Sequence, residues 1–218
     1  LADYSGRIMF HKLLLLLTLI IPSLFISQQL LAQSQHDDII NACSACHGFD
    51  GISTEAGTPN LWGQPELYLQ QQIKVFRNAS RINPIMDAVT HELPDADIIY
   101  AAQYYARQTG TLNKPLQWRG DKWPGDMSLG EQIAFSGKLS VKMPACVSCH
   151  GPSGVGVAPF FPRLGGQDKT YLISQLHAWK TAKRPPGTMG VMVAIAVSLS
   201  DKEIDAVAGY FSAQGETK

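Results

Sequence analysis

One short cysteine–histidine motif, present twice, is the part of this sequence best suited to chemistry. The motif C-x-x-C-H occupies residues 43–47 and again residues 146–150, and the two copies contain all four cysteines. Two thiols about one helical turn apart can form thioether bonds to the vinyl groups of a haem, and the next histidine then lies beneath the iron. We therefore predict two covalently bound haem c groups. Their attachment and axial residues are Cys43, Cys46 and His47 for the first, and Cys146, Cys149 and His150 for the second.

Three other uses of paired cysteines fit this sequence less well. A thioredoxin-like C-x-x-C expects a βαβ setting, which the sequence lacks. A zinc site would require the two cysteine pairs to converge, although each pair lies in its own half of the chain. Disulfides within each pair would leave the histidine that follows, twice, without a role. Haem attachment accounts for all of these residues.

The sequence around the motifs is also duplicated. The second motif begins 103 residues after the first, and the same offset relates Pro59 to Pro162 and Gln64 to Gln167. Further along the offset becomes 106, as between Leu93 and Leu199, which places a three-residue insertion within residues 183–191 of the second copy. A repeat of about a hundred residues indicates a duplicated module.

The repeat and the chain's composition predict four segments. Residues 1–32 contain an apolar run preceded by His11 and Lys12, so we interpret them as upstream residues plus a secretory signal peptide. An uncleaved membrane anchor is the alternative, although the run is shorter than the ~20 apolar residues that a spanning helix needs. The segments that follow are an N-terminal cytochrome c domain at residues 33–108, a linker at residues 109–126 and a C-terminal cytochrome c domain at residues 127–218.

Apolar spacing predicts that both modules are helical. Residues 65–80 and 168–182 carry apolar side chains at helical intervals, and so do the final segments that begin near Pro94 and Ser200. Ser200 and Glu203 have the spacing of a capping box. No segment has the alternation of a strand, so the predicted fold class is all-α, a tandem duplication of a cytochrome c-type helical domain.

The second axial ligand of each iron is predicted to be a methionine, whose soft thioether favours ferrous iron. Met86 lies seven residues before Leu93, and Met192 lies seven residues before Leu199. Counting with the offset of 103 points to Met189 instead, so Met189 stays an alternative to Met192.

The proximal histidines need a partner for their other ring nitrogen, usually a backbone carbonyl. Pro59 and Pro162 each lie 12 residues after the histidine, and we assign them that orienting role. His91 and His177 have no histidine at the equivalent position of the other copy, so neither is expected to be a ligand.

The charge and the residue types limit the function. Eighteen basic and eighteen acidic residues give a formal net charge of zero, which gives no support for nucleic-acid binding. No Ser/His/Asp or paired-carboxylate arrangement is evident. An iron with six ligands can exchange electrons but has no open position for a substrate, so we expect an electron carrier and not an enzyme.

With these residues in view, the chain resembles the cytochrome c4 family of dihaem periplasmic electron carriers. The most specific stretches are residues 143–156, 161–176 and 199–214, with counterparts in the first half. The resemblance implies one low-spin His/Met haem per domain, with a methionine seven residues before the final leucine. One departure concerns the opening of the first module: with cleavage after Ala32, only residues 33–42 precede Cys43, and this short opening is expected to leave the first haem more exposed.

The resemblance also implies partners. A bc1-type complex or a dehydrogenase would donate electrons in the periplasm, and a terminal haem–copper oxidase of a respiratory chain would accept them. Peripheral association with the membrane remains compatible with this role. Two alternatives stay open: the dihaem subunit of a larger dehydrogenase of the flavocytochrome type and, less favoured, a haem enzyme such as a peroxidase.

Overall fold

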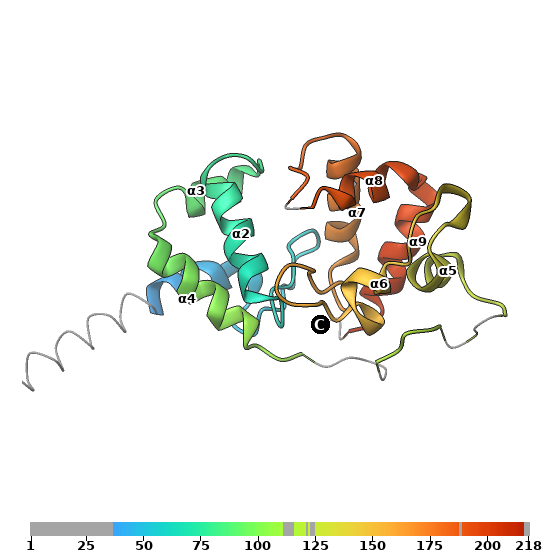
Figure 1. Ribbon diagram of the computed structural model, residues 1–218. Coiled ribbons are helices and arrows are strands. Elements are labelled where there is room, and N and C mark those ends of the chain that lie inside the picture. Colours follow the sequence, from blue (N-terminus) through green and yellow to red (C-terminus); the bar gives the residue numbers. More distant parts are fainter. Residues whose placement is uncertain (1–36, 111–115, 121, 123–124, 188, 216–218) are drawn as a thin grey trace, which may run out of the picture. The chain divides into compact units, whose positions relative to one another are not determined.

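The helices form two sets that repeat the same packing (Figure 1). In the first set, α2 (Glu66–Arg77) packs against α3 (Pro84–Thr90) and α4 (Asp95–Ala106). In the second set, α7 (Lys169–Lys180) packs in the same way against α8 (Val191–Ser198) and α9 (Asp201–Ser212). The sequence repeat thus corresponds to a repeated arrangement of three helices.

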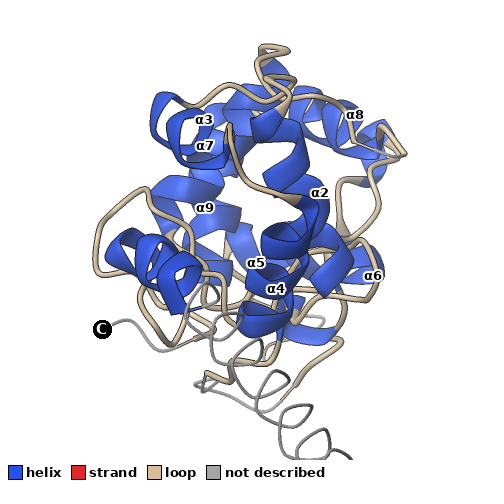
Figure 2. Ribbon diagram, turned by 90° about the vertical axis from the view of Figure 1, so that its left-hand side faces the viewer, coloured by secondary structure: helices blue, strands red, loops and turns tan. Residues whose placement is uncertain are grey.

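The computed structural model describes residues 37–110, 116–120, 122, 125–187 and 189–215. Within these ranges the chain consists of helices and loops, and extended pairing is limited to the isolated bridges Lys138–Met143 and Val157–Phe161 (Figure 2). The prediction of an all-α fold is confirmed. Residues 1–36, and with them the predicted signal segment, lie outside the described residues. No helix in the described ranges is long and apolar enough to cross a membrane.

Each copy of the C-x-x-C-H motif is carried by a helix. In the first copy the described helix covers residues 37–47 and ends on the histidine. In the second copy the motif lies on the short α6 (Val147–His150), preceded by α5 (Leu129–Ser136) and a 3₁₀ turn at Leu139–Val141; a second 3₁₀ turn, Pro152–Gly154, follows α6. The segment equivalent to α5 in the first copy falls before residue 37 and is not described.

The last helix of each set forms the centre of its core. The buried face of α4 includes Ile98, Ala102 and Tyr105, as its periodicity predicts. The equivalent residues of α9 are buried in the same way: Ile204, Ala208 and Phe211. Ser200 and Glu203 form the predicted capping box at the start of α9. The first copy begins α4 after Pro94, without a side-chain cap.

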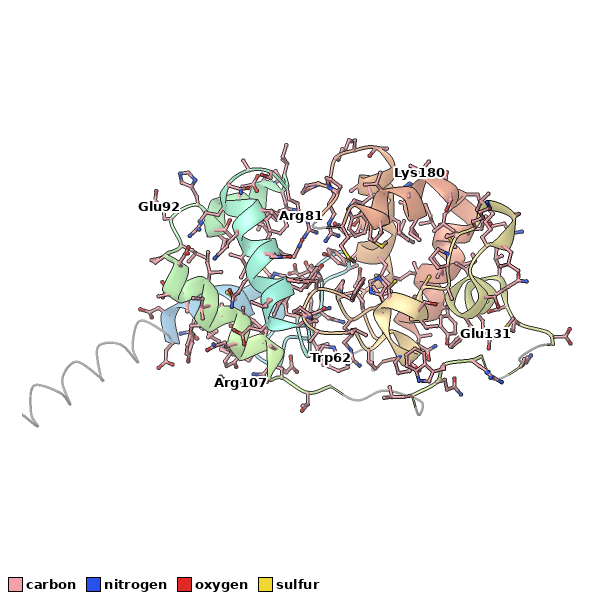
Figure 3. All side chains as sticks on the ribbon, in the orientation of Figure 1. Trp62, Arg81, Glu92, Arg107, Glu131 and Lys180 are labelled. Carbon is pink, nitrogen blue, oxygen red and sulfur yellow. The ribbon has the colours of Figure 1, made fainter. Side chains whose placement is uncertain are left out.

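Residues 42–218 form one compact unit, and within it the two helix sets are joined by buried arginines. Arg81, labelled in Figure 3, is one of them. It donates to the Oε1 atoms of Gln72 and Gln175, each at 2.6 Å. Arg184 donates to the same two oxygens at 3.0 Å. Arg81 also donates to the Tyr171 hydroxyl at 3.0 Å. Arg81 and Arg184 lie just after α2 and α7, and their bonds to Gln175 and Gln72 in the opposite helix hold the two copies against each other.

Candidate haem sites

The first candidate site is built around His47 at the end of its helix. The His47 side chain is buried, and its Nδ1 lies 2.8 Å from the carbonyl oxygen of Pro59. A carbonyl can only accept, so Nδ1 carries the proton and Nε2 keeps its lone pair. Nε2 is therefore the ring atom that could bind a metal.

The second site repeats this geometry. His150 ends α6 and is buried, and its Nδ1 lies 2.8 Å from the carbonyl oxygen of Pro162. Burial lowers the pKa of His47 and of His150, with the hydrogen bond to the proline carbonyl acting in the opposite direction. The neutral imidazole is thus favoured in both copies, which is the form that ligates iron.

The cysteines have the properties of attachment residues. All four are free, and each pair lies beside its histidine. Burial raises the pKa of Cys43 to about 11 and that of Cys146 to about 12, so both are thiols and not thiolates. Among the described residues, no group of His, Cys, Asp and Glu converges as a metal cage would require. The donor set therefore fits two haem c groups and does not fit zinc.

The structure places the candidate methionines on equivalent helices. Met86 is the third residue of α3, where the side chain of the N-cap residue Asn83 accepts the Met86 N–H at 3.0 Å. Met192 is the second residue of α8, and both methionine side chains are partly buried. Met189 lies before α8 and is 59% exposed. The ligand role of each remains a prediction.

The residues not expected to be ligands have ordinary surroundings. The His91 side chain is 75% exposed and lies near Glu92. His177 is partly buried on α7. Met143 is buried in the core of the second copy.

Sequence reasoning missed two buried hydroxyls in the first copy. Within the described part of the chain, the Tyr105 hydroxyl and the Thr90 hydroxyl have no hydrogen-bond partner. Tyr105 belongs to the same apolar cluster as Cys43, and Thr90 follows Met86 by one helical turn on α3. The equivalent residues of the second copy, Phe211 and Ala196, carry no hydroxyl. Comparing the two copies position by position would have revealed this difference.

A cavity of about 320 Å³ borders the first motif. Its lining includes Cys46, Phe49 and Ile52, and the Cys46 side chain is exposed. The equivalent Cys149 is only partly exposed. Among the described residues, the second cysteine of the first motif is therefore more exposed than that of the second motif, and the greater exposure of the first haem stays a prediction.

Known proteins share this architecture. The cytochrome c family model matches residues 135–213. Cytochrome c4 of Pseudomonas aeruginosa is 38% identical over 77% of this chain and 81% of its own length. The chain belongs to the cytochrome c4 family. The thiosulfate dehydrogenase electron acceptor of Thiomonas intermedia (strain K12) is 35% identical over 79% of this chain and 78% of its own.

A solved structure of this family has a similar fold. The crystal structure of reduced recombinant cytochrome c4 from Pseudomonas stutzeri superposes with a TM-score of 0.71, at 31% identity, over 83% of this chain and 97% of that one. This member of the cytochrome c4 family is thus a dihaem electron-transfer protein with two covalently bound haem c groups, and it is not an enzyme.

Proposed function

We propose that each haem is held by one copy of the motif and by one methionine. Cys43 and Cys46 attach the first haem, with His47 and Met86 as axial ligands, and Cys146 and Cys149 attach the second, with His150 and Met192. The observation that carries this proposal is the pair of buried histidines, each with Nδ1 held by the carbonyl 12 residues later. By holding Nδ1, the carbonyls of Pro59 and Pro162 would leave Nε2 of each imidazole available to bind iron.

The chain's residues then supply what an electron carrier needs. Bound haem supplies one-electron exchange at iron. A histidine and a methionine would together hold each iron and leave no position open for a substrate. The cores around α4 and α9 limit the access of water to the irons and lower the local polarity, which helps to set the reduction potentials.

We place this carrier in the periplasm, exported by the segment within residues 1–32. It would take electrons from a bc1-type complex or a dehydrogenase and pass them towards a terminal haem–copper oxidase of a respiratory chain. Its membership of the cytochrome c4 family and the apolar N-terminal run support this placement.

A second candidate is the electron acceptor of a dehydrogenase, either as a free acceptor or as a bound subunit. The relative from Thiomonas intermedia supports it, because its name assigns it that role for thiosulfate dehydrogenase and its match extends over both copies of the repeat. The haem sites would be the same in both cases. The two candidates differ in the donor that reduces the protein.

Stopped-flow reduction of the purified oxidised holoprotein separates the candidates. One reaction contains a thiosulfate dehydrogenase with thiosulfate, and the other contains a bc1 complex with quinol. Fast reduction by the bc1 complex alone, followed by oxidation by a haem–copper oxidase, is the result expected for the respiratory carrier. Fast reduction by the dehydrogenase alone would overturn that assignment in favour of the second candidate.

A further inference from the structure

The peptide group whose carbonyl accepts the hydrogen bond from His47 also donates a hydrogen bond through its N–H. The Pro59 carbonyl and the Asn60 N–H belong to one peptide unit. The carbonyl accepts from His47 Nδ1 at 2.8 Å, and the N–H donates to Gln167 Oε1 at 2.7 Å. Gln167 belongs to the second copy of the repeat, so a residue of one copy contacts the peptide that orients the histidine of the other.

The second histidine has the mirrored arrangement. The Pro162 carbonyl accepts from His150 Nδ1 at 2.8 Å, and the N–H of the same peptide unit, that of Arg163, donates to Gln64 Oε1 at 2.9 Å. Gln64 is the first copy's equivalent of Gln167. The two connections therefore cross from one copy to the other.

Each glutamine makes a second bond to the residue whose N–H it accepts. Gln167 Nε2 donates to the Asn60 carbonyl oxygen at 2.8 Å, and Gln64 Nε2 donates to the Arg163 carbonyl oxygen at 3.0 Å. Both glutamines are buried, with 5% of each residue exposed. The Arg163 guanidinium also lies over the Trp62 ring, 3.6 Å from its centroid. The amides are thus held in place and shielded from competing water.

We propose that Gln64 and Gln167 are positioning residues, each acting on the copy opposite its own. Gln64 would tune how strongly the histidine of the second haem donates electrons to its iron, and Gln167 would do the same for the histidine of the first haem. Hydrogen bonds in a chain polarise one another. An amide whose N–H donates has a more negative carbonyl oxygen, which draws the Nδ1 proton more strongly. Such an outer partner raises the basicity of a ligating imidazole.

The expected sign of the change in reduction potential follows from the oxidation state of iron that the imidazole stabilises. A more electron-rich imidazole stabilises ferric iron and so lowers the reduction potential. Removing the glutamine acceptor should weaken the Nδ1–H bond and raise the potential of the haem in the opposite copy. This inference rests on the proposed histidine ligation, which the spectrum of the unmodified protein tests separately.

The test uses the holoproteins of Gln64→Leu and Gln167→Leu. Potentials are assigned to each haem by following its own signals in NMR spectra during a redox titration, and ¹⁵N labelling reports the histidine Nδ1–H shift of the reduced protein. We expect Gln64→Leu to raise the second haem's potential and move the His150 Nδ1–H signal upfield. We expect Gln167→Leu to do the same for the first haem and His47.

Three further variants separate this effect from general damage to the interface. Gln70→Leu removes a glutamine whose side chain donates to Glu66 within the first copy, and it should shift neither haem. Tyr171→Phe removes a hydrogen bond to Arg81 between the two copies and leaves the Pro59–Asn60 and Pro162–Arg163 peptides unchanged. It should therefore not shift the potential of one haem alone. Gln64→Glu keeps an acceptor and should lower the second haem's potential.

The pattern of shifts decides the outcome. A change confined to the haem of the opposite copy supports the proposal. Equal shifts of both haems with Gln64→Leu, or a shift of the first haem alone, would overturn it. If the unmodified protein showed no low-spin histidine-ligated haem, the proposed function itself would be wrong, and the two failures would be distinguishable.

Discussion

The two copies of the repeat hold the same candidate ligands in different surroundings. In the second copy, α5 packs against α9 and contributes Ile133, Ala134 and Phe135 to a large buried cluster that also contacts Cys146. The described cluster beside Cys43 in the first copy is smaller, and a cavity lies beside Cys46. Cys146 is thus covered by α5, whose equivalent in the first copy lies outside the described residues.

The buried hydroxyls also differ between the copies. The first copy buries the hydroxyls of Tyr105 and Thr90 without partners, where the second copy has Phe211 and Ala196; among the described residues, the second copy buries one such hydroxyl, that of Ser136 on α5. A more polar site favours the charged ferric state. The comparison teaches that the two copies kept the same candidate ligands while the hydroxyls around them diverged, so we expect the first haem to have the lower potential.

The largest effect is expected from removing the methionines one at a time. Met86→Ala should open the first iron alone, and Met192→Ala the second alone, each turning one haem high-spin and able to bind carbon monoxide. Met189→Ala is the matched control and should leave both haems low-spin. Optical and electron paramagnetic resonance spectra measure this. A normal spectrum for Met192→Ala together with a high-spin haem for Met189→Ala would reverse the assignment.

Enclosure of the second copy depends on a close approach at Gly130. A Cβ at this position of α5 would meet the carbonyl oxygen of Ala206 and lie 2.9 Å from Tyr210 Cβ. Gly130→Ala should lower the free energy of unfolding by about 1–3 kcal/mol because the helices must separate. Denaturant unfolding followed by the haem absorbance measures this.

Gly209→Ala provides the matched control for that change. Its Cβ would lie 3.6 Å from Lys169 Cε, an ordinary contact, so it should stabilise α9 by up to about 1 kcal/mol through helix propensity. Equal stability of the two variants would show that the contact between α5 and α9 does not enclose the second site tightly.

The capping box of α9 has no counterpart on α4 and should give the second copy a pH-dependent contribution. The hydrogen bond from the Ser200 N–H, followed by that from Lys138, lowers the pKa of Glu203 from 4.5 to about 2. A lowered carboxyl pKa stabilises the fold above the ordinary value, and this contribution is lost as the pH falls from about 4.5 towards 2.

Ser200→Ala should therefore cost about 1 kcal/mol of stability near neutral pH. Glu203→Gln should remove this part of the pH dependence. Thermal unfolding of the holoproteins between pH 2 and pH 7 measures both effects. A stability difference between Ser200→Ala and the unmodified protein that is as large at pH 2 as at pH 7 would show that the charged carboxylate is not involved.

The smallest effect is expected from making the first copy resemble the second. Tyr105→Phe removes a buried hydroxyl without changing the ring and should raise the first haem's potential slightly. A redox titration followed by NMR measures the shift, and Phe211→Tyr should lower the second haem's potential. If Tyr105→Phe lowers the first haem's potential, polarity at this position does not account for the difference between the copies.

Much of the fold could be predicted from sequence because the repeat supplied a check within one chain. The helices at residues 65–80 and 168–182 were predicted correctly, although both end earlier than expected. Residues Ala79 and Ala182 have φ of 57°, a left-handed conformation that terminates the helical region. Local propensity gives little sign of such an ending at alanine.

The contacts that join the copies were not predictable in the same way. The C-x-x-C-H spacing and the repeated prolines identified the histidines and their carbonyl partners, because these lie close in sequence. The glutamines that contact the opposite peptide bond to residues about a hundred positions away in the chain, and so do the arginines that follow α2 and α7. Sequence periodicity contains no information about such pairings.

The most direct test of the central claim is the optical spectrum of the purified holoprotein, recorded oxidised, reduced, and reduced with carbon monoxide. Two low-spin haems whose reduced spectrum is unchanged by the gas are predicted, because histidine and methionine fill every axial position. A high-spin component that binds carbon monoxide would show an open iron and would contradict the account of both haems as His/Met electron carriers.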